Sequence, residues 1–223
     1  MMRSLFGGQL PAAVIYDLDG TLVDSVPDLH SAVERFQQQL GLPTASECEV
    51  RDWVGNGAAR LVERALAASA GERAEALFPA AMEAFMVAYA DTNGRRARLY
   101  EGVRPVLEAL AAEGVPQALV TNKPLAFTHP LLEKLGIASY FSPVLGGDSL
   151  PAKKPDPAPL RAVAETLGVA PERCLMVGDS RNDLLAARAA GMPVACVSYG
   201  YNHGEPIAVS CPDLLVDSLL KLL

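Results

Sequence analysis

Two carboxylates stand one residue apart where an apolar run near the start of the chain ends. Residues 14–16 are followed by Asp17, Leu18, Asp19 and Gly20. Two such acids repel each other unless a cation lies between them, so the pair favours a hard divalent metal such as Mg²⁺. Gly20 allows the backbone to approach a bound ligand closely. This segment is therefore our first candidate for a metal-assisted reaction.

Polar side chains also follow three later apolar runs. They are Thr121 and Asn122 after residues 115–120, Lys154 in the loop after residues 141–145, and Asp179 and Asp183 after residues 174–177. If the runs are parallel strands, all four ends meet at the edge where open α/β sheets bind ligands. Carboxylates, a hydroxyl, an amide and an ammonium group together supply what phosphoryl transfer needs, which is mainly positioning and charge neutralisation.

Each of these residues also has a simpler structural explanation. An Asp-Gly pair after a strand often marks only a turn. Thr121 and Asn122 could cap the helix that follows them, and Asp179 could be the N-cap of the next helix. Lys154 could belong to a solvated lysine pair with Lys153. The recurrence of polar residues after all four strands favours a site over these separate explanations.

Strands and helices alternate along most of the chain. We expect strands near residues 14–16, 115–120, 141–145, 174–177, 194–197 and 214–216, with helices between them that end at glycines. This alternation predicts an α/β fold with a Rossmann-like, mostly parallel sheet. Asp217 is a plausible N-cap for a terminal helix.

A long helical segment interrupts this alternation directly after the first strand. Helical spacing is found near residues 28–40, 46–54, 58–70 and 72–90, and we expect no strand in this segment. We infer an all-helical cap domain, residues 24–98, inserted into an α/β core formed by residues 1–23 and 99–223.

Composition limits the classes of partner. The chain has 223 residues, half of them hydrophobic, and a net charge of -7, which argues against a nucleic-acid backbone or an anionic membrane as partner. We expect neither a signal peptide nor a transmembrane segment. The four cysteines have no zinc-ligand spacing, so we expect reduced thiols and a cytoplasmic protein. The expected partner is a small phosphorylated metabolite.

The ordered set of motifs resembles that of the haloacid dehalogenase superfamily phosphatases. Residues 17–21 read D-L-D-G-T, like the first motif of that family, and Thr121 stands in the position of the second. Lys154, just before a proline, resembles the third motif, and residues 178–183 resemble the fourth, G-D-x-x-x-D. The resemblance spans nearly the whole chain, and it also implies an α/β core with an inserted cap.

Further segments are similar to the phosphoglycolate phosphatase branch of this family. They are W-V-G-N-G at 53–57, T-N-K at 121–123, G-D-S at 147–149 and Y-G-Y at 199–201. The resemblance implies hydrolysis of 2-phosphoglycolate to glycolate and phosphate. The alternative is a phosphatase or phosphomutase of the same family that acts on another small metabolite, such as a sugar phosphate.

The same resemblance implies a role for each site residue. Asp17 would attack phosphorus and form an aspartyl-phosphate, and Asp19 would act as general acid and then as general base. Mg²⁺ would be held by the carboxylates of Asp17 and Asp179 and by the backbone carbonyl of Asp19.

The phosphoryl group would be held by other side chains. Thr121 and Asn122 would donate hydrogen bonds to it, and Lys154 would stabilise the charge on both nucleophile and phosphate. Asp183 would either support the metal's water shell or orient Lys154. Gly20 would support the loop that carries the two acids.

Two other classes of protein fit less well. A receiver-type module that is phosphorylated on an aspartate would share the acidic site but would not need a helical insertion or a second acid at Asp19. A dehalogenase of the same superfamily would also lack that second aspartate. The sequence leaves open whether the protein is a monomer or a homodimer.

Overall fold

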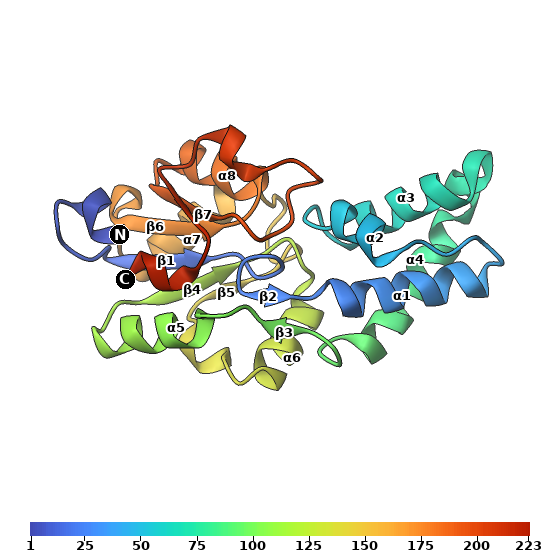
Figure 1. Ribbon diagram of the computed structural model, residues 1–223, viewed down its shortest axis with the longest axis horizontal. Helices are drawn as coiled ribbons and strands as arrows, with labels where there is room; N and C mark the ends of the chain where they lie inside the picture. The colour runs from blue at the N-terminus through green and yellow to red at the C-terminus, as the bar shows by residue number, and fades with distance from the viewer.

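The computed structural model describes residues 1–223. Its core is a parallel sheet of six strands in the order β5-β4-β1-β6-β7-β8 (Figure 1). The strands are β1 (Ala13–Tyr16), β4 (Gln117–Val120), β5 (Val144–Leu145), β6 (Cys174–Gly178), β7 (Val194–Val197) and β8 (Leu214–Val216). The predicted α/β class with a Rossmann-like parallel sheet is confirmed. The first strand lies in the middle of the sheet, so its carboxyl end has neighbours on both sides.

Two pairs of helices cover the two faces of the sheet. They are α5 (Val103–Ala112) and α6 (Leu125–Lys134) on one face, and α7 (Ala158–Leu167) and α8 (Arg181–Ala190) on the other. Side chains of a strand alternate between faces, so Val14 and Tyr16 pack with the first pair while Ala13 and Ile15 pack with the second. Burial on both faces explains why β1 reads as a continuous apolar run.

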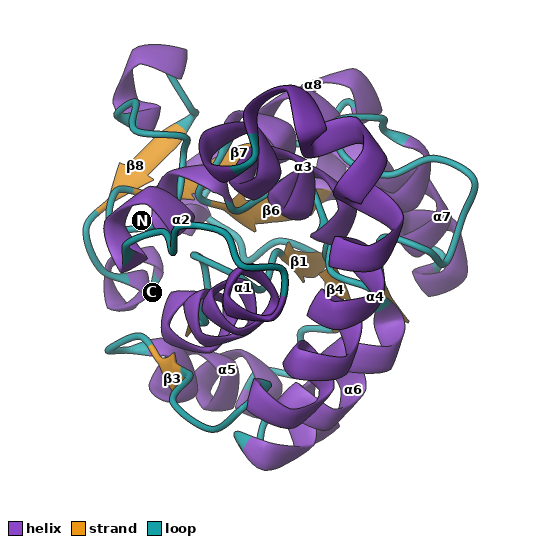
Figure 2. Ribbon diagram, turned by 90° about the vertical axis from the view of Figure 1, so that its right-hand side faces the viewer, coloured by secondary structure: helices purple, strands orange, loops and turns teal.

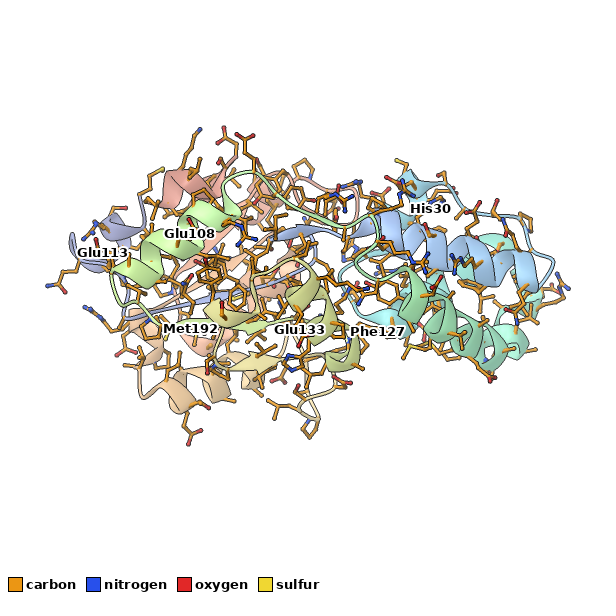
Figure 3. The ribbon with its side chains drawn as sticks, turned by 90° about the horizontal axis from the view of Figure 1, so that it is seen from below. His30, Glu108, Glu113, Phe127, Glu133 and Met192 are labelled. Atoms are coloured by element: carbon orange, nitrogen blue, oxygen red, sulfur yellow. The ribbon has the colours of Figure 1, made fainter.

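Four further helices form a separate bundle at one end of the molecule. They are α1 (Val26–Gln39), α2 (Glu47–Trp53), α3 (Ala58–Ser69) and α4 (Ala74–Thr92). Figure 2 shows these four helices toward the viewer, and their apolar faces enclose a second hydrophobic core. We call residues 24–98 the cap. Phe127 of α6 lies where the sheet domain meets the cap (Figure 3), and with Tyr201 it completes this second core.

A small two-stranded sheet connects the cap to the rest of the chain. The antiparallel strands β2 (Val23–Asp24) and β3 (Arg98–Leu99) pair where the chain enters and leaves the cap. The prediction of no strand between residues 24 and 98 was therefore wrong at both ends. Two-residue strands are too short to show an alternating pattern, so periodicity cannot detect them.

Two predictions near other strands were also wrong. The strand expected at 141–145 is only Val144–Leu145, because Pro143 has no N–H group for the ladder. The expected terminal helix is present as a short 3-10 helix, but its N-cap is Ser218 and not Asp217. The 3-10 helices are Met2–Phe6, Gly71–Arg73, Ala138–Tyr140, Pro171–Arg173, Ile207–Ser210 and Leu219–Leu222. None of the helices combines the length and apolar character that crossing a bilayer requires.

Candidate active site

The carboxyl edge of the sheet brings the predicted site residues together. β1 pairs with β4 on one side and β6 on the other, which places the loop after Tyr16 between the loops after Val120 and Gly178. The site residues that the structure buries almost completely are Asp17, Thr121, Asn122, Lys154, Asp179 and Asp183. Asp19 is partly exposed.

Lys154 connects two of the carboxylates. Its Nζ lies 2.9 Å from Oδ1 of Asp17 and 2.7 Å from Oδ1 of Asp183, and it also donates to the backbone carbonyl of Val120. Burial disfavours a charged ammonium group, but the two carboxylates outweigh this effect and raise the pKa of Lys154. The lysine is therefore a fixed positive charge beside Asp17.

Three buried carboxylates provide a site that fits a metal ion. Asp17, Asp179 and Asp183 each offer an oxygen, and these atoms lie within 4.8 Å of one another. Oδ1 of Asp17 is buried and accepts no well-formed hydrogen bond. One lysine against three carboxylates leaves the group short of positive charge, and hard oxygen ligands of this kind suit Mg²⁺.

The raised pKa values of Asp17 and Asp179 also favour a metal ion at this site. Burial, together with the nearby Asp183, raises the pKa of Asp17 to about 6 even though Lys154 opposes the shift. Burial and the neighbouring carboxylates also raise the pKa of Asp179 well above its usual range. A divalent cation between these groups would favour their ionised forms.

Asp179 is held by both of its oxygens. The hydroxyl of Thr21 donates to Oδ1 at 2.7 Å, and the backbone N–H of Tyr201 donates to Oδ2 at 2.6 Å. Gly20 and Gly200 pack against this carboxylate so closely that a Cβ atom would lie 2.3 and 2.2 Å from its atoms. Both positions therefore require glycine.

Asp183 lies in the first turn of α8 and links that helix to the lysine. Its Oδ2 accepts from the backbone N–H groups of Asp179 and Ser180, while Oδ1 accepts from Lys154. Ser180, not Asp179, is the N-cap of α8, so the simpler explanation of Asp179 as a cap does not apply. The contact with Lys154 supports the orienting role for Asp183, although the carboxylate also belongs to the acidic group.

Thr121 and Asn122 do not cap α6, which begins after Pro124 without a side-chain cap. The Nδ2 atom of Asn122 donates to the backbone carbonyls of Gly55 and Lys154 at 3.0 and 2.9 Å. Its amide donors are thus committed to the protein. The backbone N–H groups of Leu18, Asp19 and Asn122 make no hydrogen bond within the protein. These backbone donors are available to an anion beside Asp17.

Lys123 and Tyr89 are site residues to which the motifs assign no role. The Lys123 ammonium lies 3.1 and 3.3 Å from the carboxylate oxygens of Asp19 and donates to the hydroxyl of Tyr89 on α4. Lys123 directly follows Thr121 and Asn122, and this adjacency is the one signal in the sequence. Tyr89 lies on a helix of mainly apolar residues, so the pattern indicates only core packing.

A small cavity lies between the cap and the carboxyl edge of the sheet. Its volume is about 40 Å³, and it is reached by the two acids of the first loop and by Lys123. Its other walls are largely apolar and come from both domains, including Leu29, Val54, Ala58, Leu61, Phe85, Tyr89 and Pro124. The space suits a small molecule with an anionic end toward the sheet and apolar surroundings elsewhere.

The loop after α2 closes over this cavity. The carbonyl of Gly55 accepts from Asn122 at 3.0 Å and from Asn182 at 3.1 Å, and the carbonyl of Asn56 accepts from Lys153 at 3.0 Å. His203 lies at the same rim and contacts the backbone carbonyl of Asp52.

His30 and three arginines of the cap have structural partners. His30 lies on α1 (Figure 3), and its ring contacts the backbone carbonyl of Ala45 at 3.0 Å. Arg51 lies 3.5 Å from Asp24, and Arg64 donates to the carbonyl of Trp53. Arg60 pairs with Glu63 on the surface of α3. None of these residues lines the cavity.

Comparison with known proteins places this arrangement in a family. The sequence model described as hydrolase, haloacid dehalogenase-like hydrolase, matches residues 11–191. The chain belongs to the haloacid dehalogenase-like hydrolases, and it is an enzyme.

Relatives with similar sequences carry a more specific name. The phosphoglycolate phosphatase of Nitrosococcus oceani is 49% identical over 213 residues, which cover 95% of each chain. Phosphoglycolate phosphatase 1 of Pseudomonas aeruginosa is 50% identical over 220 residues, 98% of this chain and 80% of the relative. The resemblance to the phosphoglycolate phosphatase branch is confirmed.

Solved structures share the whole fold. The crystal structure of a predicted phosphoglycolate phosphatase from Haemophilus somnus is 40% identical, with a TM-score of 0.91 over 95% of this chain and 96% of that one. A structure from Lactobacillus delbrueckii subsp. bulgaricus is 28% identical, with a TM-score of 0.86 over 96% of this chain and 97% of the other. The inserted helical bundle is thus part of a fold found in related proteins.

Proposed function

We propose that this enzyme is a Mg²⁺-dependent phosphomonoester hydrolase that converts 2-phosphoglycolate to glycolate and phosphate through an aspartyl-phosphate. One observation carries the proposal. The buried carboxylate of Asp17 lies 2.9 Å from Lys154 and within an acidic group that fits a metal ion, and it lines a small cavity between the cap and the sheet. A nucleophile, a fixed cation and a metal site therefore converge on one point.

Asp17 and Asp19 would carry the two chemical steps. An oxygen of Asp17 forms a bond to phosphorus as the bond from phosphorus to the leaving oxygen breaks, and Asp19 gives that oxygen a proton. Water then attacks the aspartyl-phosphate, Asp19 takes a proton from the water, and the bond between Asp17 and phosphorus breaks. Asp17 and Asp19 are thus restored to their starting states.

The remaining residues would hold the phosphoryl group and the metal. Asp17, Asp179 and the backbone carbonyl of Asp19 are the proposed ligands, and bound Mg²⁺ would neutralise charge on the phosphoryl oxygens. Thr121 and the free backbone N–H groups near it are the proposed donors to those oxygens. Asp183 keeps Lys154 directed at the nucleophile.

Gly20 and Asn122 would act through the backbone and the cap. The positive φ of +93° at Gly20 turns the first loop so that it passes directly against Asp179. Asn122 links the carbonyl of Lys154 to the carbonyl of Gly55 in the cap, so we assign its side chain a bridging role. The predicted contact with phosphate would then come from its free backbone N–H.

Two features support a small substrate. The cavity measures about 40 Å³, and residues of the cap form much of its wall. Relatives about 50% identical over nearly the whole chain are named phosphoglycolate phosphatase. In this proposal residues 24–98 act as a cap domain that excludes water from the reaction. We also propose a cytoplasmic location, which four free cysteines support.

The test is phosphate release from 2-phosphoglycolate and from a panel of sugar and nucleotide monophosphates, with Mg²⁺ and with EDTA. We expect a strong preference for 2-phosphoglycolate that EDTA abolishes. Asp17→Asn should reduce turnover by about 1,000-fold or more, whereas the exposed Asp217→Asn should not change it. Equal turnover across the panel would refute the substrate, and full activity in Asp17→Asn would refute the nucleophile.

A second measurement tests the intermediate itself. Borohydride reduces an acyl phosphate to an alcohol, so quenching the enzyme with borohydride during turnover should convert Asp17 to homoserine, detectable by peptide mass spectrometry. The mark should be absent without substrate and absent in Asp17→Asn. A mark on a different aspartate would move the nucleophile to that residue.

A further inference from the structure

Lys123 is a buried lysine that the proposed reaction steps do not use. Its side chain is only 3% exposed, and lysine is almost never buried this far unless it is paired. Its partners are the carboxylate of Asp19, at 3.1 and 3.3 Å, and the hydroxyl of Tyr89. Burial opposes the charge, but the neighbouring Asp19 outweighs it and raises the pKa of Lys123.

Lys123 is also the single cationic side chain that lines the cavity. Lys154 lies behind Asp17 and is occupied by Asp17, Asp183 and a backbone carbonyl. Lys153 lies on an exposed loop and donates to the carbonyl of Asn56. For the second anionic group of a substrate bound in this space, Lys123 is therefore the one cationic side chain that lines the cavity.

The position of Lys123 fits a short, doubly anionic molecule. Its backbone N–H donates to the hydroxyl of Thr121 at 3.2 Å, so the residue belongs to the loop that carries the proposed phosphate donors. Its ammonium group reaches toward the cap, where it lies 4.6 Å from the ring centre of Tyr89. One end of a ligand can therefore lie at Asp17 while the other end meets Lys123.

Packing holds Tyr89 in place on the far side of the ammonium group. Its ring stacks on Phe85 of the same helix at 5.5 Å and packs on Phe127 of the sheet domain at 4.8 Å. The hydroxyl is thereby fixed toward the cavity. A carboxylate that displaces or joins Asp19 at Lys123 would also meet this hydroxyl as a hydrogen-bond donor.

We propose that Lys123, aided by Tyr89, binds the carboxylate of the substrate and so determines the specificity of the enzyme. The inference rests on the proposed function, because it assigns the second anionic group of the same substrate. Each anionic group of 2-phosphoglycolate then has its own lysine: Lys154 stabilises the charge at the phosphoryl end, and Lys123 binds the carboxylate end. The cap supplies Tyr89, so the carboxylate is recognised where the cap meets the sheet domain.

The experiment compares 2-phosphoglycolate with ethyl phosphate, which has a similar size and no carboxylate. Lys123→Met keeps the length of the side chain and removes its charge. We expect kcat/KM for 2-phosphoglycolate to fall about 100-fold, while kcat/KM for ethyl phosphate changes much less. The ratio of the two values is the readout, because any effect of the substitution on Asp19 reduces turnover of both substrates.

Three further variants sharpen the test. Lys123→Arg, which retains the charge, should restore part of the preference, and Tyr89→Phe should raise KM for 2-phosphoglycolate more than for ethyl phosphate. The exposed Lys221→Met should leave both substrates unchanged. Turnover of ethyl phosphate by Lys123→Met also reports that the variant is folded.

The two proposals fail in different ways. A wild-type enzyme with no preference for 2-phosphoglycolate over ethyl phosphate would overturn the proposed substrate and the role of Lys123 together. A wild-type preference that survives unchanged in Lys123→Met would overturn the role of Lys123 alone. An equal loss for both substrates would also overturn it, because Lys123 would then act through Asp19 and not through the carboxylate.

Discussion

Thr21 offers a sharp test of how the metal site is supported. Its hydroxyl is fully buried and donates to Oδ1 of Asp179 at 2.7 Å, a short distance typical of a hydrogen bond to a carboxylate. Thr21→Val keeps the shape of the side chain and removes only this donor. The other oxygen of Asp179 keeps its bond from the backbone of Tyr201, so the carboxylate stays in place while losing half of its support.

The expected size of the effect follows from this one bond. A hydrogen bond to a charged group contributes about 1.5–3 kcal/mol, and loss of a partner behind a metal ligand lowers metal affinity by about 10- to 100-fold. We therefore expect the Mg²⁺ concentration that gives half-maximal phosphate release to rise by that factor. At saturating Mg²⁺ most of the activity should return.

Thr166→Val is the matched control. Thr166 also donates its hydroxyl to an acceptor at 2.8 Å, the carbonyl of Ala162, but it lies on the exposed side of α7. The same substitution there should change the free energy of unfolding by no more than about 0.5 kcal/mol and leave the Mg²⁺ requirement unchanged. If Thr21→Val lowers the unfolding free energy but leaves the half-saturating Mg²⁺ concentration unchanged, Asp179 is not a metal ligand supported by Thr21.

Two further predictions concern the same loop. Gly20→Ala would place a Cβ atom 2.3 Å from Asp179 at a φ of +93°, so we expect a loss of at least about 1–3 kcal/mol in urea unfolding and a weaker Mg²⁺ response. Gly168→Ala, at a φ of +65° with nothing within 4 Å of the new atom, isolates the cost of backbone strain alone. Because burial raises the pKa of Asp17 to about 6, protons compete with Mg²⁺ below that pH. The half-saturating Mg²⁺ concentration should therefore rise as pH falls through about 6, and a constant value from pH 5 to pH 8 would contradict this.

The sequence predicted the sheet and the edge where the reactive residues meet, because both follow from periodicity and from polar residues at strand ends. The order of the strands in the sheet could not be predicted, because the pairing of strands depends on contacts between segments that are distant in the sequence. Lys123 and Tyr89 show a different limit. A lysine after a strand is usually solvated, and a tyrosine on an apolar helix usually packs in the core. Only the contact between Lys123 of the sheet domain and Tyr89 of the cap shows that both belong to a site.

The wrong cap assignment at the end of the chain arose because neighbouring residues of similar type could each cap the same helix. Asp217 and Ser218 are both good helix caps, and the choice between them depends on where the last turn begins. Asp217 instead pairs with Lys221 one turn later. Thr121 and Asn122 are likewise good caps by residue type, yet Pro124 is the N-cap of α6, and both of them remain at the site. Residue type alone does not separate a cap from a ligand-binding group.

The side chain of Asn122 connects the cap to the catalytic loops. The amide of Asn122 donates both to the carbonyl of Gly55 in the cap and to the carbonyl of Lys154, whose ammonium group contacts Asp17. Because one amide serves both contacts, moving Gly55 away would leave Asn122 with an unpaired donor directly beside the lysine loop. A substrate that bridges Asp17 and Lys123 would favour the closed arrangement, in which Tyr89 meets Lys123. We therefore expect binding of the carboxylate to raise kcat as well as lower KM.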